Sequence, residues 1–136
     1  MAPDCITHSR MTDPGEFPGV LDSLPEDPAD LCRIVQGLLV HSDWLSSYGL
    51  HGRRSEGMSR ETLPVAEWLR RVLEADGRPI AVERPPTRRS PATCRDFALM
   101  LCSFLRTKGT PARIRCGFAS YFGDQWEDHW ICEYWT

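Results

Sequence analysis

The sequence predicts an α+β fold, in which N-terminal helices and a central apolar helix pack on a small antiparallel sheet. Two patterns favour this class. Apolar residues recur with helical period through much of the chain, and two short segments near its end are rich in β-branched and aromatic residues. With 136 residues, 41% of them hydrophobic, the chain can bury one modest core. We therefore expect a loose N-terminal arm over residues 1–27 and a single domain over residues 28–136.

The first helix is predicted to begin after Asp27, whose side chain can cap it. Pro28 suits the first turn, where a backbone N–H would have no partner within the helix, and Gly49 is the expected end. The apolar stripe of this helix consists of Leu31, Ile34, Val35, Leu38 and Leu39.

The second helix follows a segment in which Ser59 and Thr62 compete as caps, and Gly77 should end it. Its apolar stripe consists of Val65, Trp68, Leu69 and Val72. The proline-rich residues 78–93 predict an extended connector, because proline and the residue before it disfavour a helix.

The third helix is predicted to begin at Cys94 and to end before Gly109. Its side chains are apolar on nearly every face, which is typical of a helix at the centre of a domain. Residues 112–122 and 129–135 predict strands, because they are β-branched and aromatic and too short for helices. The turn residues between them favour an antiparallel pair.

Composition argues against several classes of protein. A net charge of −3 weighs against a nucleic-acid partner. The sequence has no apolar run of roughly 18 residues that could span a membrane, and no secretory signal, so we expect a cytoplasmic location. Its six cysteines form no C-x-x-C pair and no zinc-like spacing. We therefore expect no disulfide framework, no metal and no organic cofactor.

The position of Cys94 sets it apart from the other cysteines. Thr93 can cap the third helix, and Asp96 can complete a capping box. Unpaired N–H groups and the helix dipole at such a start stabilise a thiolate, and the same N–H groups can bind an oxyanion. The alternative is a buried structural thiol. That alternative is our expectation for Cys32, Cys102, Cys116 and Cys132.

A nucleophilic thiol needs a base, and His129 is the best placed histidine. It opens the last predicted strand, where a rigid backbone would hold its ring. His8 lies in the arm, His41 at the predicted end of the first helix and His51 in a loop. From the residues alone, a catalytic Cys94–His129 pair and a purely structural role are both open.

The stretch "CRDFALMLCSFLRTKGTPARIRCGF", followed by "EDHWICEYW", resembles the core of the transglutaminase-like superfamily, relatives of papain-type cysteine proteases. The resemblance covers residues 94–135, and residues 28–50 and 59–74 resemble upstream helices of bacterial members more weakly. It implies a papain/transglutaminase-like core. In that core Cys94 is the acyl-accepting nucleophile and His129 the general base.

The resemblance also implies a missing group. Family members carry an Asp that orients the imidazole on the strand after the histidine strand, whereas this sequence ends at Thr136. We therefore expect a domain truncated after the histidine strand, working with a Cys–His dyad. Asp128, Glu133 or Asp43 could replace the missing carboxylate. A second chain could also supply it across the exposed edge strand, which would make a homodimer.

Additional site residues are expected upstream of the nucleophile. Gln36 and Trp44 are candidate orienting groups or oxyanion donors, whereas Trp68 fits the helical stripe and belongs in the core. Arg84, Arg88 and Arg89 lie in the loop just before Cys94, which favours an anionic or phosphate-bearing acyl substrate. The alternative for these arginines is a solvated basic face.

Two functions follow from these patterns. The first is a cysteine-dependent acyl transferase or hydrolase that forms an acyl-thioester on Cys94 and resolves it with an amine or water. Its substrate would be a small-molecule or carrier-bound acyl group, as in a biosynthetic pathway, or a peptide. The alternative is a non-catalytic module that binds a peptide or partner and lacks a complete triad.

Overall fold

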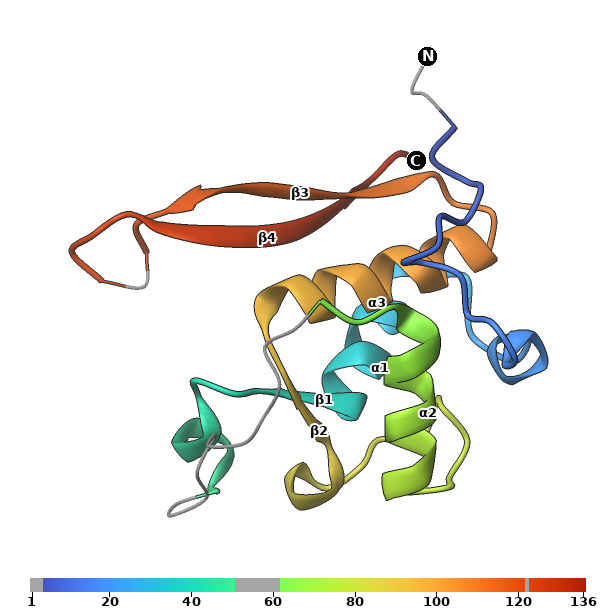
Figure 1. Ribbon diagram of the computed structural model, residues 1–136, viewed down its shortest axis with the longest axis horizontal. Coiled ribbons are helices and arrows are strands. Elements are labelled where there is room, and N and C mark those ends of the chain that lie inside the picture. The colour runs from blue at the N-terminus through green and yellow to red at the C-terminus, as the bar shows by residue number, and fades with distance from the viewer. Residues whose placement is uncertain (1–3, 51–61, 122) are drawn as a thin grey trace.

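The structure is a computed structural model that describes residues 4–50, 62–121 and 123–136. A long antiparallel hairpin lies along one side of a central helix, and two further helices lie on its other side (Figure 1). This arrangement confirms the predicted α+β class. The elements in chain order are η1 (Pro18–Leu21), α1 (Pro28–Leu38), β1 (Leu39–His41), η2 (Leu45–Tyr48), α2 (Val65–Ala75), η3 (Pro86–Arg88), β2 (Ser90–Ala92), α3 (Cys94–Thr107), β3 (Ala112–Ala119) and β4 (Glu127–Tyr134).

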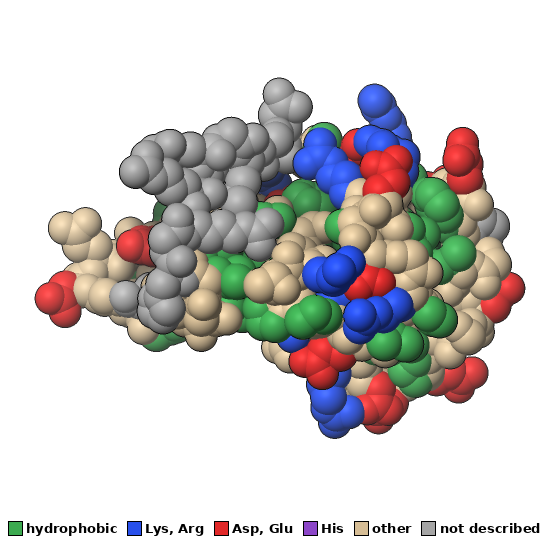
Figure 2. Space-filling view, turned by 90° about the horizontal axis from the view of Figure 1, so that it is seen from below, with side chains coloured by type: hydrophobic (Ala, Val, Ile, Leu, Met, Phe, Trp, Pro, Cys, Tyr) green, Lys and Arg blue, Asp and Glu red, His purple; other side chains and the backbone are tan. Residues whose placement is uncertain are grey.

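The outer surface of the helical layer carries charges of both signs. Figure 2 shows Lys and Arg side chains interspersed with Asp and Glu rather than gathered into one basic patch. Such a mixed surface is what a solvated face requires. In the described part of the chain, no helix has the length and apolarity needed to cross a bilayer.

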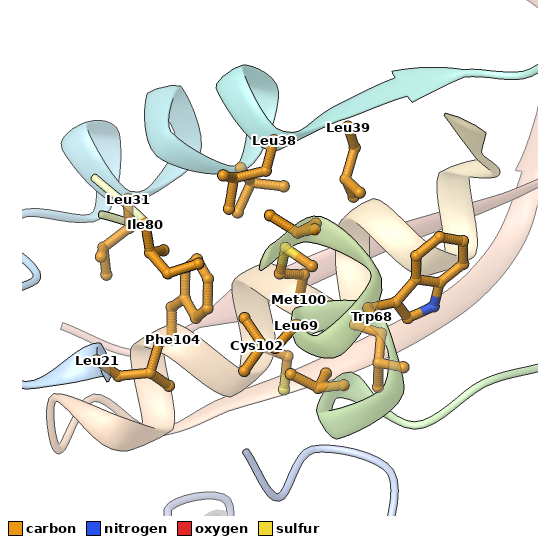
Figure 3. Packing of buried hydrophobic residues seen from close by; sticks show 14 of the residues in the cluster. Leu21, Leu31, Leu38, Leu39, Trp68, Leu69, Ile80, Met100, Cys102 and Phe104 are labelled. Atoms are coloured by element: carbon orange, nitrogen blue, oxygen red, sulfur yellow. The ribbon is translucent and has the colours of Figure 1, made fainter. Parts of the chain in front are cut away.

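The core forms where α1, α2 and α3 meet, and α3 lies at its centre as predicted. Met100, Phe104 and Leu105 of α3 are completely buried. Full burial of such a side chain contributes about 1.5–3 kcal/mol. Figure 3 shows this packing: Leu31 and Leu38 of α1, Trp68 and Leu69 of α2, and Met100, Cys102 and Phe104 of α3, together with Leu39 of β1 and Ile80 of the connector.

The N-terminal arm packs in part against this core, with Phe17 and Val20 half-buried beside it. Leu21 and Leu24 belong to the buried cluster. The Ser103 hydroxyl of α3 donates to the carbonyl oxygen of Thr12, and the amide of Ala112 donates to that of Cys5 at 2.9 Å. Residues 4–27 contain little regular structure, but these hydrogen bonds hold their backbone against α3 and β3.

Helix α1 begins as predicted and ends earlier. The Asp27 carboxylate accepts hydrogen bonds from the amides of Ala29, at 2.8 Å, and Asp30, at 3.2 Å. The helix stops at Leu38 rather than near Gly49, because the chain continues as strand β1. Gly49 instead ends the short helix η2, with the positive φ of 77° that glycine tolerates.

Strand β1 pairs in parallel with β2, a contact that sequence periodicity did not predict. Leu39 lies opposite Ser90, and His41 lies opposite Ala92. Leu39 and Val40 are completely buried. Periodicity cannot tell whether a short buried apolar run forms a strand or part of a helix. Here the partner strand, far along the chain, decides that it is a strand.

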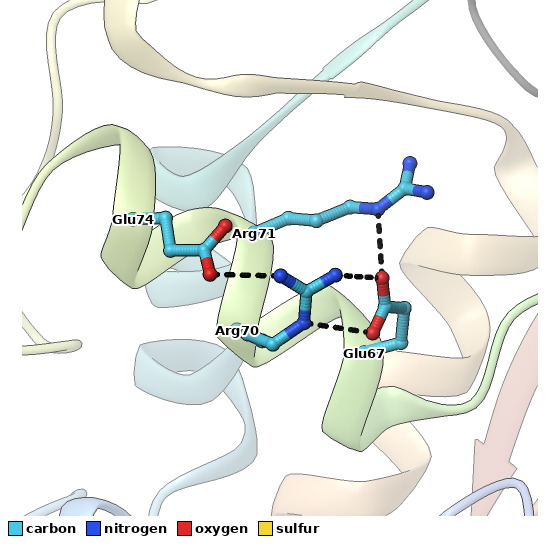
Figure 4. Close-up of polar contacts among 4 residues, drawn as sticks. All are labelled: Glu67, Arg70, Arg71 and Glu74. Atoms are coloured by element: carbon cyan, nitrogen blue, oxygen red, sulfur yellow. Dashed lines mark hydrogen bonds and ion pairs between the residues drawn. The ribbon is translucent and has the colours of Figure 1, made fainter.

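Helix α2 has the predicted stripe but begins at Val65, without a side-chain cap from Thr62. Ser59, the other predicted cap, lies outside the described residues. The Val65 amide donates to the Met11 carbonyl oxygen at 2.9 Å instead. On the outer face, Figure 4 shows Arg70 bridging two glutamates, Glu67 and Glu74, on neighbouring turns. Exposed pairs of this kind contribute about 0.3–0.5 kcal/mol each.

The connector after α2 is largely extended, as predicted, and is organised by a buried arginine. The Arg84 guanidinium is 1% exposed and donates to four backbone carbonyl oxygens. Gly37 allows the connector to approach α1, because a Cβ there would lie 3.2 Å from the Cα of Glu83. Arg84 therefore holds the loop together and does not face a substrate.

Strands β3 and β4 form the predicted antiparallel pair, from Ala112 opposite Tyr134 to Ala119 opposite Glu127. Ile114 and Cys132 lie opposite each other and pack against the core. His129 and Glu133 belong to the alternate face, because side chains alternate along a strand. The hairpin therefore packs on the core through Ile114 and Cys132, and the register by itself does not turn His129 toward α3.

Candidate active site

A hollow of about 570 Å³ lies where the start of α3, the end of β1 and the start of β4 meet. It contains both a thiol and the predicted base. Its lining residues are His41, Asp43, Trp44, Thr93, Cys94, Arg95, Glu127, Asp128, His129 and Trp130. Cys94 and His129, which lie 35 residues apart in the sequence, therefore line one hollow.

A second, more apolar hollow of about 460 Å³ adjoins the first. The two share four lining residues: His41, Cys94, His129 and Trp130. The remaining walls come from α1, η2, α3 and β4, and Gln36 is among them. Cys94 therefore lines both the first, more polar hollow and the second, apolar hollow.

The capping box predicted at the start of α3 is present and fixes the backbone around Cys94. The amide and the hydroxyl of Thr93 each donate to Oδ2 of Asp96 at 2.9 Å. Cys94 is the first helical residue and is half-buried. An amide at this position has no acceptor within the helix and can bind a developing negative charge.

His129 reaches the hollow from the start of β4, where residues 127–130 all contribute to the lining. Its ring meets Tyr121 edge-on, with ring centroids 5.8 Å apart and an interplanar angle of 88°. Cys94 and His129 therefore meet in the lining of one hollow.

The predicted replacements for an orienting carboxylate differ in their surroundings. Glu133 is paired with Arg113 and Arg115, and its hydrogen bond with Arg113 holds its pKa below the ordinary value. Asp128 belongs to the face of β4 opposite His129, as expected, yet it lines the hollow, and so does Asp43. Asp43 and Asp128 therefore line the hollow that His129 also lines, whereas Glu133 does not.

Of the other predicted site residues, Trp44 lines the polar hollow and is 45% exposed. Trp68 is buried in the core, as expected. Arg88 and Arg89 line a separate hollow together with residues of the connector. Arg89 donates to the Arg84 carbonyl oxygen at 2.8 Å and to Glu83 at 2.9 Å. The structure does not bring these two arginines to Cys94.

His41 is the site residue that sequence reasoning missed. The sequence prediction placed it toward the end of the first helix, away from the nucleophile. The β1–β2 pairing instead sets it opposite Ala92, two positions before Cys94. No local pattern carried this information, because the pairing joins segments about fifty residues apart.

The cysteines predicted to be structural differ in burial: Cys102 is buried, and Cys32 and Cys132 are half-buried. The hydrogen bond that the Cys132 thiol donates to Cys102, together with burial, raises the pKa of Cys132, and burial raises that of Cys32. Cys116 is exposed on β3. In residues 4–50, 62–121 and 123–136, no three His, Cys, Asp or Glu side chains form a group suited to a metal ion.

Comparison with known proteins gives one match. Residues 60–136 match the family model of the Transglutaminase-like superfamily. That segment contains α2, α3 and both strands of the hairpin. Neither a search of curated proteins nor a search of solved structures found a match.

Proposed function

The chain belongs to the transglutaminase-like superfamily, and from this premise we propose that it is a cysteine-dependent acyl transferase or hydrolase. Cys94 is the nucleophile and His129 the base. The observation that carries the proposal is the hollow that both residues line, at a helix start whose first amides are available to an oxyanion. Family membership alone supports cysteine-based acyl transfer or proteolysis only in general.

In the first half of the reaction, His129 accepts the proton of the Cys94 thiol as the sulfur attacks the acyl carbonyl carbon. The carbonyl π electrons move to oxygen, and the Cys94 amide donates to the resulting oxyanion. The intermediate then collapses and expels an amine or thiol, which takes the proton from the imidazolium. The product is an acyl-thioester on Cys94.

In the second half, water or an amine attacks the thioester carbonyl while His129 accepts its proton. Collapse expels the Cys94 sulfur, which recovers the proton from the imidazolium. Asp43 and Asp128 line the same hollow and are the candidates to orient the ring. Hydrolysis and amide formation differ only in the second nucleophile.

The substrate class that the surroundings favour is an acyl group with an apolar portion. Phe97, Leu101 and Ile131 line the apolar hollow beside Cys94. Arg88 and Arg89 lie elsewhere, so they support an anionic carrier only through a contact remote from the thiol. We therefore propose a thioester with a medium-length acyl chain as the first substrate to test.

The test is intact-mass detection of an acyl adduct after exposure to an octanoyl thioester of N-acetylcysteamine or to a glutamine peptide. We expect one adduct, lost in Cys94→Ala and retained in Cys116→Ala, which removes the exposed control thiol. An adduct that persists in Cys94→Ala, or no adduct on the wild-type protein, would refute the assignment.

One observation favours the alternative, a peptide-binding module. The far end of the hairpin exposes large aromatic side chains: Phe118 and Tyr121 are 75% and 71% exposed, and Trp126 is 71% exposed. Exposed aromatic residues are common at binding surfaces. A module would bind its peptide equally well in Cys94→Ala and would form no adduct, so the same experiment separates the two functions.

A further inference from the structure

We propose that His41 is a second catalytic group of this site, which donates a hydrogen bond from Nε2 to the oxyanion formed on attack by Cys94. The inference rests on the proposed function and deepens it. The oxyanion would then have two donors, the Cys94 amide from the helix start and the His41 ring from strand β1. His129 keeps the separate task of moving protons.

The first argument is the position of the His41 backbone. His41 lies opposite Ala92 in the parallel ladder, and the amide of the next residue, Ser42, donates to the Ala92 carbonyl oxygen at 2.8 Å. Cys94 follows Ala92 by two residues. Strand pairing therefore holds the histidine and the nucleophile at a constant separation, which preorganised stabilisation of charge requires.

The second argument is the position of the His41 ring. It stacks on Phe97, with centroids 6.4 Å apart and an interplanar angle of 20°. Phe97 belongs to the first turn of α3, so the ring rests on the helix that begins with Cys94. His41 lines both the polar and the apolar hollow, and among the described residues it shares this position with Cys94, His129 and Trp130.

The third argument is the tautomer. The Asp43 amide donates to Nδ1 of His41 at 3.1 Å. A backbone amide can only donate, so Nδ1 must accept, and in the neutral ring the proton lies on Nε2. A ring in this state is a hydrogen-bond donor at Nε2 and cannot accept a proton there. His41 is therefore suited to stabilise an oxyanion and unsuited to deprotonate the thiol.

Trp44 is the competing donor, because its indole also lines the polar hollow. It lies outside the strand, next to η2, and is 45% exposed, whereas His41 is half-buried and held by a strand, a stacked ring and a backbone hydrogen bond. Preorganisation determines how much a donor contributes to catalysis. The geometry therefore favours His41.

The test compares two reactions of Cys94 in the full chain. Acylation by the octanoyl thioester forms an oxyanion, whereas alkylation by iodoacetamide displaces iodide at carbon and forms none. His41→Phe keeps the stacked ring and removes the donor. We expect it to slow acylation by about 100- to 1,000-fold, the effect of removing one oxyanion donor, and to change alkylation by less than about twofold. His41→Gln, which restores an N–H donor, should recover part of the loss.

Each other outcome overturns the inference. Equal slowing of acylation and alkylation would make His41 a base, and an unchanged acylation rate would make it structural. A larger loss in Trp44→Phe than in His41→Phe would transfer the role to the indole. ¹⁵N chemical shifts of the His41 ring provide a readout independent of acylation, and a neutral ring protonated at Nδ1 would contradict the proposal. Absence of acylation in the wild-type protein would instead refute the proposed function.

Discussion

The buried carboxylate of Asp96 is predicted to be the main determinant of the helix start that carries Cys94. Asp96 is 2% exposed, and its Oδ2 accepts two hydrogen bonds from Thr93. Hydrogen bonds to a charged group contribute about 1.5–3 kcal/mol each. Oδ1 is buried without a hydrogen-bond partner among the described residues, which offsets part of that gain. We therefore expect Asp96→Ala to lower the free energy of unfolding by about 2–3 kcal/mol.

Asp30 provides a matched control, because it occupies the same third position in α1 that Asp96 occupies in α3. Its side chain is 45% exposed and pairs with the exposed Arg33. An exposed carboxylate in a first turn contributes about 0.3–1 kcal/mol through the helix dipole. Asp30→Ala should therefore lower the free energy of unfolding by less than about 1 kcal/mol, the size of this helix-dipole contribution.

The assay is urea unfolding followed by intrinsic tryptophan fluorescence, in which the buried Trp68 becomes exposed to water on unfolding. The same two variants are then tested for acylation of Cys94, which should fall in Asp96→Ala under conditions where the protein stays folded. Equal destabilisation by the two substitutions would refute the reasoning. It would mean that burial and the two bonds to Thr93 add nothing to the general preference for a carboxylate at a helix start.

Three further predictions follow from the structure. His129→Ala should slow acylation of Cys94 by about 100- to 10,000-fold with an unchanged circular dichroism spectrum, because it removes the base from a half-buried position; an unchanged rate would contradict the assignment. Glu133 has a pKa below its ordinary value of 4.5 because it bonds to Arg113, so its stabilisation is present above pH 4.5 and is lost as the pH falls through the lowered pKa. Glu133→Gln should flatten the loss of stability in acid, and parallel pH profiles of the two proteins would argue against this role. Arg84→Met should lower the free energy of unfolding by about 3 kcal/mol or more, because four carbonyl oxygens lose their donor. The control Arg88→Met, at an exposed position, should have little effect. Similar urea midpoints for both variants would contradict the role of Arg84.

The elements predicted correctly are those whose cause is local. The Thr93 cap and the Asp96 carboxylate lie within three residues of the helix start that they determine. The apolar side chains on nearly every face of α3 indicated a central helix, and the β-branched and aromatic residues near the chain end indicated the hairpin. Both were confirmed, because helix capping and side-chain alternation depend on neighbours in sequence.

The errors arose where a distant segment decided the conformation. Residues 39–41 belong to an apolar run that suits a helix or a strand, and pairing with residues 90–92 made them a strand. Proximity in sequence suggested that Arg88 and Arg89 approach the nucleophile, whereas the connector places them in another hollow. The backbone hydrogen bonds that join the arm to α3 and β3 likewise connect segments far apart in the sequence.

By itself, the sequence determined the class of fold, the helix start that presents Cys94 and the strand that carries His129, because short-range hydrogen bonds and side-chain periodicity establish all three. Only the tertiary structure decided which groups surround the thiol. It placed His41 beside Cys94 through a parallel strand pair and removed two arginines from the site. The physical reason is that parallel strands are joined by long connections, so the ladder that aligns them leaves no local pattern in either segment.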